Sequence, residues 1–348
     1  MPKNHVTIKD VANAAGVSFQ TVSKVLNQNM QVSKETEKRI LEAVNDLGYR
    51  PSYTARSLRA KRSFTVGYSW APSPPNQSNP ILDSFLQSMF LEAEVHGYYL
   101  LSFPFHEDYQ QHLSAYNELI DTGRVDGFVL SSIGYQDKRL TLLQERKFPF
   151  VCFGRSNPEL DFNWIDVDGG DGIRQAVNHI LEQGHTRVGV LAWPEDSRVG
   201  NNRIEGYFTT MRAAGLPLDP AWIRRGQGCY DFGFQATQEL LALPEAQRPT
   251  ALIAMNDMMA VGAIQAAKKA GLAVGPQFAV AGFDNDPMVQ YIDPPLTTVG
   301  QPIEAVGRRI ISMLLTLVQS EDQQPEVENI LLKPQLVIRA STLRGSRP

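Results

Sequence analysis

The sequence predicts a small all-α head of the helix-turn-helix type with a hinge helix, followed by an α/β core of two doubly wound lobes. Two observations support this division. Residues 1–62 carry eleven Lys and Arg against five Asp and Glu, a net charge of +6, which leaves −10 for the rest of a 348-residue chain whose total is −4. The apolar residues also change from helical spacing before residue 50 to strand-like runs alternating with helices from residue 64. We therefore expect a polyanion-binding head on an acidic body, with boundaries at 1–50, 51–62 and 63–348.

The composition excludes several classes of protein. With 43% hydrophobic and 20% charged residues, the chain is globular. Its two cysteines, Cys152 and Cys229, form neither a disulfide framework nor a zinc finger. No apolar run is long enough for a membrane helix, and the amino terminus lacks a signal core, so we expect a cytoplasmic protein. Because no metal-ligand spacing, Walker loop or nucleophile elbow occurs, we expect no metal, no cofactor and no catalytic residue.

Two short helices open the chain. Thr7 and Asp10 have the spacing of a capping box, and Gly16 ends the first helix where a left-handed backbone suits glycine. Ser18 caps a second helix over about 19–26. A third helix is expected from Ser33 to Leu47, with an apolar stripe made of Ile40, Leu41, Val44 and Leu47.

The second helix is the candidate for the major groove. Gln20 suits an adenine edge, Lys24 suits guanine O6 and N7, and Phe19 suits a thymine methyl group. Hydroxyls at helix starts suit phosphate oxygens, at Thr7, Ser18 and Ser33. The alternative is a generic three-helix bundle with a solvated polar face.

A basic stretch follows at 49–61. Pro51 separates it from the third helix, and Ser52 can cap a short helix that is too small to be stable alone. Its one large apolar residue, Leu58, suits a wedge into a base step from the minor groove. The alternative is a flexible charged linker.

The segments Thr7–Ala12, Gly16–Asn27, Tyr49–Pro51 and Ala55–Leu58 resemble the lactose-repressor (LacI/GalR) family of bacterial regulators. In that family the residues matching Phe19, Gln20 and Lys24 read bases, and the residue matching Leu58 is a minor-groove lever at the centre of a palindromic operator. The family often has Arg at the position of Lys24, and Lys lacks the bidentate fork of Arg. The residues expected to contact DNA are Thr7, Ser18, Phe19, Gln20, Thr21, Ser23, Lys24, Asn27, Ser33, Tyr49, Ala55 and Leu58.

The body alternates strands with helices, which predicts parallel sheets covered by helices. About 280 residues are many for one such sheet, so we expect two lobes, with crossovers near 163–168, 296–300 and 320–330. Strands are expected at 64–70, 98–103, 127–130, 150–153, 188–193, 251–255 and 278–283, and helices at 81–96, 171–183, 203–214, 232–243, 258–270 and 303–318.

Ligands of such folds bind beyond the carboxyl ends of the strands, here in a cleft between the lobes. Polar residues follow four strands at such positions, namely Arg155, Arg203, Asn256 and Asp284. Trp70, Trp193 and Tyr230 can stack on a ligand face. Carboxylates and an Arg fork suit the vicinal hydroxyls of a sugar. Each polar residue taken alone has a plain alternative as a helix cap or surface residue, and each aromatic as core packing.

The body also resembles that family. The segments Ala254–Asp257, Ala281–Asp284 and Pro294–Val299 are similar to signatures of its periplasmic-binding-protein-like effector domain. The resemblance makes Arg203 the effector-binding arginine and Asn256 and Asp284 polar ligands. The purine-binding branch has a further arginine where this chain has Ser197, which favours a sugar over a nucleobase.

These observations predict a transcriptional repressor that binds a pseudo-palindromic DNA operator as a homodimer and responds to a mono- or disaccharide. The dimer is expected because no leucine-rich tail follows the strand-like segment at 336–339. Three alternatives remain: a corepressed regulator of the same fold, a solute-binding protein without DNA affinity, and an enzyme.

Overall fold

The computed structural model describes residues 6–26, 32–50, 57, 60–70, 79–157, 159–320 and 326–344. The chain separates into two compact units, Met1–Ser63 and Phe64–Pro348. Within the described ranges, no helix combines the length and the apolar character that crossing a membrane requires.

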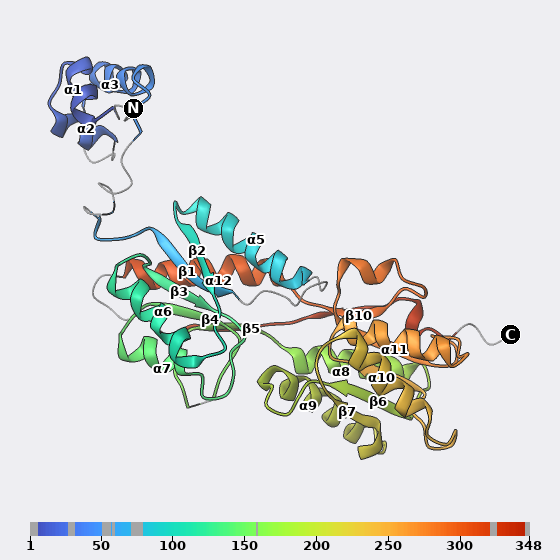
Figure 1. Cartoon of the computed structure of the whole chain (residues 1–348). Helices are drawn as coiled ribbons and strands as arrows, with labels where there is room; N and C mark the ends of the chain where they lie inside the picture. The colour runs from blue at the N-terminus through green and yellow to red at the C-terminus, as the bar shows by residue number, and fades with distance from the viewer. Residues whose placement is uncertain are drawn as a thin grey trace. The chain divides into compact units, whose positions relative to one another are not determined.

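Within its described residues, the first unit contains the helices α1 (Ile8–Ala15), α2 (Phe19–Leu26) and α3 (Lys34–Asp46), which share one core (Figure 1). Both the amide and the hydroxyl of Thr7 donate to Asp10 Oδ2, at 2.7 Å, which closes the first turn of α1. These hydrogen bonds from Thr7 lower the pKa of Asp10. Gly16 ends the helix with a φ of 65°. The core of this unit is small and consists of Val11, Ala12, Ala15, Val22, Ile40 and Ala43.

The apolar stripe expected on α3 is only partly correct. Ile40 and Ala43 are buried, but Leu41 and Leu47 are 46% and 37% exposed. Leu41 lies about 100° around the helix from Ile40, and Leu47 is the C-cap beyond the last helical turn. The buried face of α3 is therefore narrower than the set of apolar residues in its sequence suggests.

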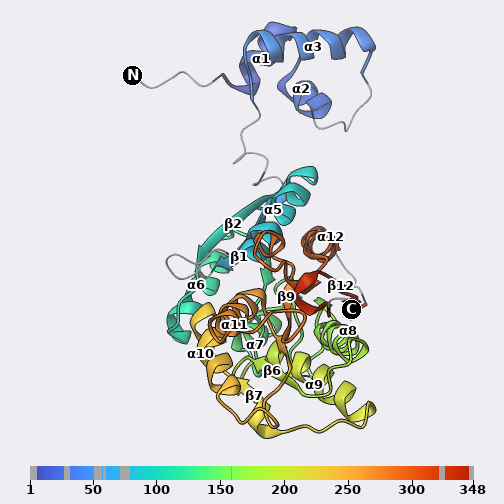
Figure 2. The ribbon, with the colours of Figure 1, turned by 90° about the vertical axis from the view of Figure 1, so that its right-hand side faces the viewer.

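The second unit has two lobes, each built on a six-stranded sheet (Figures 1 and 2). The first sheet has the order β11-β5-β4-β3-β1-β2 and the second β12-β10-β9-β8-β6-β7. Only the β10–β12 pair is antiparallel among the pairs described. The strands are β1 (Thr65–Trp70), β2 (Tyr99–Pro104), β3 (Gly127–Leu130), β4 (Phe150–Phe153), β5 (Trp164–Val167), β6 (Val188–Ala192), β7 (Ile223–Arg225), β8 (Ala251–Ala254), β9 (Ala279–Asp284), β10 (Thr297–Gly300), β11 (Asn329–Leu332) and β12 (Gln335–Val337).

Helices cover both faces of each sheet. In the first lobe, α5 and α12 share one core with the sheet, and α6 and α7 share the other. In the second lobe, α8 and α9 cover one face, and α10 and α11 the other. The helices are α5 (Pro80–Val95), α6 (Tyr109–Asp121), α7 (Lys138–Glu145), α8 (Gly169–Glu182), α9 (Arg198–Ala213), α10 (Tyr230–Leu241), α11 (Asp257–Lys269) and α12 (Ile303–Gln319), with short 3-10 turns η1 (Pro220–Trp222), η2 (Pro287–Gln290) and η3 (Ala340–Thr342).

The chain passes between the two sheets three times. It leaves the first sheet after β5, returns to it after β10, and leaves it again after β11. The third crossing, expected within 320–330, lies instead between Leu332 and Gln335, because β11 still pairs with β5. All three crossings bring the carboxyl ends of the two sheets toward the same region, where a cleft is expected.

Helix α9 also differs from the expectation. It begins at Arg198, five residues earlier than expected, because the Ser197 side chain accepts the Gly200 amide and caps the helix. Arg203 therefore lies in the second turn of α9 instead of opening the helix. The first two turns of α9 contribute Ser197, Arg198, Val199, Asn202 and Arg203 to the lining of the cleft.

Candidate functional site

The first unit exposes one side of α2. Phe19 is 50% exposed, and Gln20 and Lys24 are also exposed, whereas Val22 is buried in the core. Ser18 Oγ accepts the Thr21 amide at 3.1 Å and so fixes the first turn of this helix. The side chains expected to read bases therefore share the outward face of one capped helix.

The other residues expected to contact DNA lie around this helix or outside the described residues. Thr7 and Ser33 are exposed at the starts of α1 and α3, where Ser33 Oγ accepts the Thr36 amide at 3.2 Å. Thr21, Ser23 and Tyr49 are half-buried. Asn27, Ala55 and Leu58, with most of the expected hinge helix, lie outside the residues that the structure describes.

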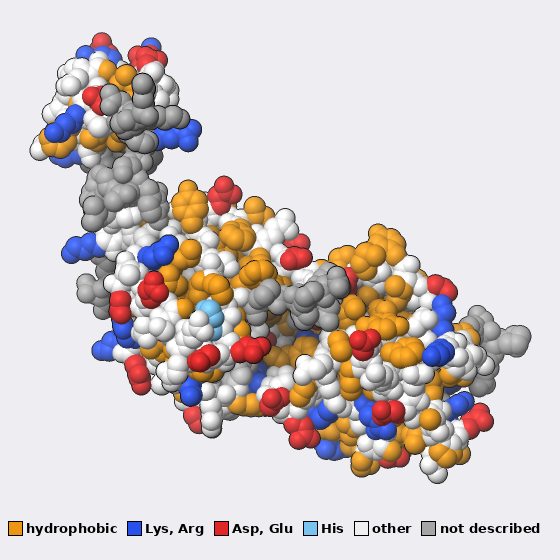
Figure 3. Space-filling model, viewed as in Figure 1, with side chains coloured by type: hydrophobic (Ala, Val, Ile, Leu, Met, Phe, Trp, Pro, Cys, Tyr) orange, Lys and Arg blue, Asp and Glu red, His pale blue; other side chains and the backbone are white. Residues whose placement is uncertain are grey.

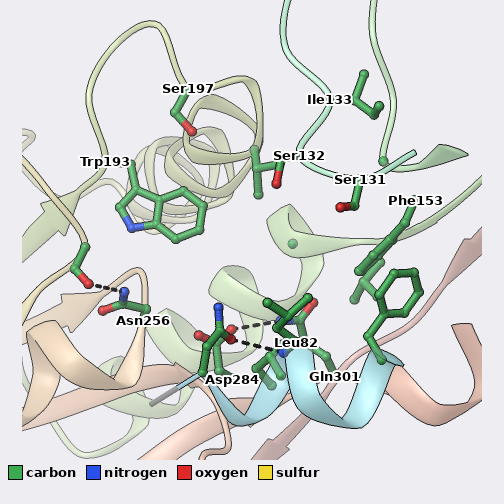
Figure 4. A pocket seen from close by; sticks show the side chains of 18 of the residues that line it. Leu82, Ser131, Ser132, Ile133, Phe153, Trp193, Ser197, Asn256, Asp284 and Gln301 are labelled. Atoms are coloured by element: carbon green, nitrogen blue, oxygen red, sulfur yellow. Dashed lines mark hydrogen bonds between the residues drawn. The ribbon is translucent and has the colours of Figure 1, made fainter. Parts of the chain in front are cut away.

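The second unit contains a cavity of about 830 Å³ between its lobes. Four of the residues expected to bind an effector line it, namely Trp193, Arg203, Asn256 and Asp284. Figure 4 shows Trp193, Asn256 and Asp284 on one side of the cavity and Ser131, Ile133 and Phe153 on the other. The four residues come from three strand ends and from α9, so the carboxyl-end rule locates this wall correctly.

Arg203 and Asp284 lie next to each other in this wall of the cavity. Arg203 is 4% exposed, its Nη1 donates to the Met255 carbonyl, and its Nη2 lies 3.9 Å from Asp284 Oδ1. The guanidinium also stacks on Phe283, at 3.6 Å from the ring centroid, and on Trp193, at 4.8 Å. A buried, oriented guanidinium next to a carboxylate can donate to and accept from neighbouring hydroxyls of one ligand.

Burial dominates the electrostatics of this pair. It raises the pKa of Asp284 to about 6, opposed by the Arg203 charge and by the hydrogen bond from Gln301, at 2.8 Å. Burial lowers the pKa of Arg203, and the Asp284 charge opposes this change. The φ of Asp284 is 120°, a region that side-chain-bearing residues rarely occupy. Strained backbone of this kind is typical of ligand-binding sites, where the surrounding structure fixes a side chain in one position.

Asn256 and Asp257 anchor the start of α11 beside the cavity. Asn256 Oδ1 accepts the Met259 amide at 2.9 Å as a helix cap, and its Nδ2 donates to the Gly228 carbonyl at 2.8 Å. Asp257 accepts from the Thr298 hydroxyl at 2.5 Å and from the Asp286 amide at 2.7 Å. Burial and the nearby Asp284 raise the pKa of Asp257 well above its usual value.

Two glycines allow this arrangement. A Cβ atom on Gly228 would lie 2.6 Å from Asn256 Nδ2 and 2.8 Å from Trp193 Nε1. A Cβ atom on Gly169 would lie 2.9 Å from Arg203 Cγ. The glycine-rich start of α8 therefore makes room for Arg203, and Gly169 lines the cavity.

Three expected effector ligands do not line the cavity. Arg155 Nε donates to Asp166 Oδ2 at 2.7 Å, and the guanidinium lies over the Trp164 ring; Asp166 lines the cavity, whereas Arg155 does not. Trp70, at the end of β1, is 39% exposed. Tyr230 stacks on Phe234 within α10, with ring centroids 6.1 Å apart.

The wall from the first lobe was missed by sequence reasoning. It is mainly apolar, and it includes Tyr68, Ile81, Leu82, Phe85, Ile133 and Phe153 together with Ser131 and Ser132. Tyr68, Ser131 and Phe153 lie at or near the carboxyl ends of β1, β3 and β4, so the rule that found Asn256 would also have found them. The apolar residues of α5 carry no such signal, because they also form its core face.

Comparisons with known proteins agree with both units. Residues 7–52 match the family model for bacterial regulatory proteins of the lacI family, and residues 177–342 match that for a periplasmic binding protein-like domain. The HTH-type transcriptional repressor CytR of Escherichia coli K12 is 34% identical over 336 residues, covering 97% of this chain and 96% of the relative. The HTH-type transcriptional repressor PurR of Aliivibrio fischeri MJ11 is 32% identical over 340 residues, with coverages of 97% and 98%.

Solved structures extend the same likeness. A regulatory protein of the LacI family from Chloroflexus aggregans is 51% identical, with a TM-score of 0.77 over 80% of this chain and 98% of that one. The lac repressor dimer bound to operator and the anti-inducer ONPF is 28% identical, with a TM-score of 0.83 over 97% and 99%. The chain therefore belongs to the lacI family of bacterial regulatory proteins.

Proposed function

We propose that this protein is a sequence-specific transcriptional repressor in the cytoplasm. It binds a pseudo-palindromic operator as a homodimer, and an uncharged mono- or disaccharide bound between the lobes lowers its operator affinity. The observation that carries the effector proposal is the pairing of buried Arg203 with half-buried Asp284, with Asn256 beside them, facing an apolar wall across the cavity. Sugars have this pattern of hydroxyl edges and apolar faces.

The head supports the operator proposal. Residues 1–62 have a net charge of +6, whereas the rest of the chain is net negative, and α2 exposes Phe19, Gln20 and Lys24 on one face. Phosphate contacts of the helix starts then orient α2, and its side chains read the base edges. Operator affinity should fall steeply with salt, because each neutralised phosphate releases counterions.

Exposed apolar side chains on the second unit support the homodimer. Phe90, Leu91 and Val95 of α5 are 47%, 57% and 78% exposed, and Tyr99 of β2 is 69% exposed. Met288 and Tyr291 in the second lobe are 64% and 76% exposed. Figure 3 shows hydrophobic side chains gathered over α5 and over part of the second lobe. Two copies that bury such a face place two heads on two half-sites of one operator.

The charge of the cavity supports an uncharged ligand. Five aspartates line it, at 166, 196, 257, 284 and 286, against three arginines, at 139, 198 and 203. Even with the Asp257 carboxyl protonated, as its raised pKa favours, the three arginines do not outnumber the other four aspartates, so the cavity offers no excess of cations to a phosphorylated or carboxylated sugar. The neutral hydroxyls of an unmodified sugar accept and donate hydrogen bonds without adding charge.

The test combines a ligand screen with operator binding. Thermal unfolding of the full chain is followed with mono- and disaccharides and with their phosphorylated counterparts, because a ligand that binds the native state raises Tm. The sugar with the largest shift is then added to a complex with an operator obtained by selection from random DNA. We expect the neutral sugar to weaken operator binding. An effector that tightens operator binding would make the protein a corepressed regulator. If selection from random DNA yields no operator sequence, the repressor proposal is refuted.

A further inference from the structure

Among the residues that the structure describes, three polar contacts join the two lobes beside the cavity. Asn201 Nδ2 of α9 donates to the Tyr135 hydroxyl of the first lobe at 3.3 Å. Arg198 Nε, also of α9, donates to the Ser156 carbonyl at 3.3 Å. Arg198 Nη1 lies 3.9 Å from Asp166 Oδ2, a carboxylate of β5. Tyr135, Ser156 and Asn201 do not line the cavity, so these contacts extend beyond the ligand-binding walls.

Hydrogen bonds within the first lobe hold the loops that carry Tyr135 and Ser156. Arg139 pairs with Asp137 at 2.6 Å, and both side chains are 5% exposed. The same guanidinium donates to the carbonyls of Ser131 and Ser132, at 3.0 and 3.3 Å, which fixes the loop that leads to Tyr135. Ser156 Oγ donates to the Gly134 carbonyl at 2.9 Å and links the loops after β3 and β4.

The side of the second lobe is held in the same way. Asn201 Nδ2 also donates to the Glu195 carbonyl at 2.7 Å, and its Oδ1 accepts from Arg225 Nη1 at 3.3 Å. Arg225 Nη1 in turn donates to the Trp193 carbonyl at 3.0 Å. The first turns of α9 therefore form an ordered surface of the second lobe. This surface meets the ordered loops of the first lobe through a few partly exposed contacts.

We propose that Arg198, Asn201 and Tyr135 form an inter-lobe clasp that keeps the two lobes in contact beside the cavity, the closed state, before any ligand enters. Rigid bodies joined by a few weak contacts change by opening at those contacts, because their packed interiors do not deform. The clasp residues are positioning residues, since they act by setting the population of the closed state. On the proposed function, the effector binds the closed state. Loss of the clasp then raises the apparent Kd of the effector in inverse proportion to the fraction of molecules that remain closed.

The test needs no effector and no operator, so its outcome is independent of the proposed function. Hydrogen–deuterium exchange of the full-length, ligand-free chain is followed by mass spectrometry for Tyr135→Phe and Arg198→Met. We expect Tyr135→Phe to raise the exchange rates of peptides covering 131–137 and 195–203 by about two- to tenfold, from the loss of one neutral hydrogen bond. Arg198→Met, which removes a charged donor, should raise them by about tenfold or more.

The matched control is Arg212→Met, the same change on the same helix. Arg212 pairs with Glu205 of its own lobe at 3.6 Å, and both side chains are more than 60% exposed. This variant should leave exchange at the cleft unchanged. The clasp is refuted if both clasp variants exchange like the native chain at 131–137 and 195–203. It is also refuted if exchange rises equally in β3 and β8, because the contacts would then support the fold as a whole.

Discussion

Replacing Arg203 by Met tests the centre of the proposed effector site. Met keeps the length and much of the apolar contact with Phe283 and Trp193, and it removes all donors and the charge. A hydrogen bond from a charged group contributes about 1.5–3 kcal/mol, so the loss of one such bond to a sugar weakens binding by about 10- to 150-fold.

The substitution also affects stability. Asp284 loses its neighbouring cation but keeps the hydrogen bond from Gln301. Because burial already raises the pKa of Asp284 to about 6, its carboxyl takes up a proton near neutral pH and avoids part of the cost of an unpaired buried charge. We expect a loss of about 1–3 kcal/mol, or several degrees in Tm.

The assay measures both properties of the full chain. Calorimetry gives the Kd of the sugar found in the screen, and fluorescence anisotropy gives the operator affinity with and without it. Arg203→Met should bind operator like the native protein and fail to release it when the sugar is added, whereas Arg212→Met on the same helix should respond normally. A sugar Kd within twofold of the native value would refute the role assigned to Arg203.

Three further changes test other parts of the proposal. Lys24→Ala should reduce discrimination between selected and scrambled operators by about 5- to 150-fold, because a good side-chain pair with a base contributes about 1–3 kcal/mol; an equal loss on both duplexes in anisotropy titrations would assign Lys24 to phosphate. Gly228→Ala should weaken sugar binding about tenfold or more by calorimetry, since its Cβ would lie 2.6 Å from Asn256 Nδ2; native affinity would show that this contact is relieved without cost. The raised pKa of Asp284 contributes stability below about pH 4 that is lost as pH rises to about 6. Asp284→Asn, which cannot titrate, should therefore lose less stability than the native protein across this window in denaturant titrations, and parallel curves would contradict the raised pKa.

Local signals in the sequence predicted much of the architecture. Thr7, Asp10, Gly16 and Ser18 set the bounds of the first helices, because caps act within one turn of the chain. Buried parallel strands are continuous apolar runs, so most strands of the two sheets were recognisable. The helices α6 and α7 were missed, and α7, with five of its eight residues polar, gave no comparable pattern.

The candidate site was predicted only in part. Asn256 and Asp284 were found because both lie at the ends of strands. Arg155 was expected beside them, but a carboxylate on the neighbouring strand β5 holds it at 2.7 Å. Strand order decides this pairing, and a single sequence does not contain strand order.

The sequence by itself determined the two units, their opposite charges and the wall of the cavity that Arg203, Asn256 and Asp284 form. Only the tertiary structure decided what faces that wall and what joins the lobes. Tyr135 and Asn201 are 66 residues apart, and Arg198 and Ser156 are 42 apart. Contacts of this kind depend on how two separately folded sheets meet, whereas caps, periodicity and net charge are properties of neighbouring residues or of the chain as a whole.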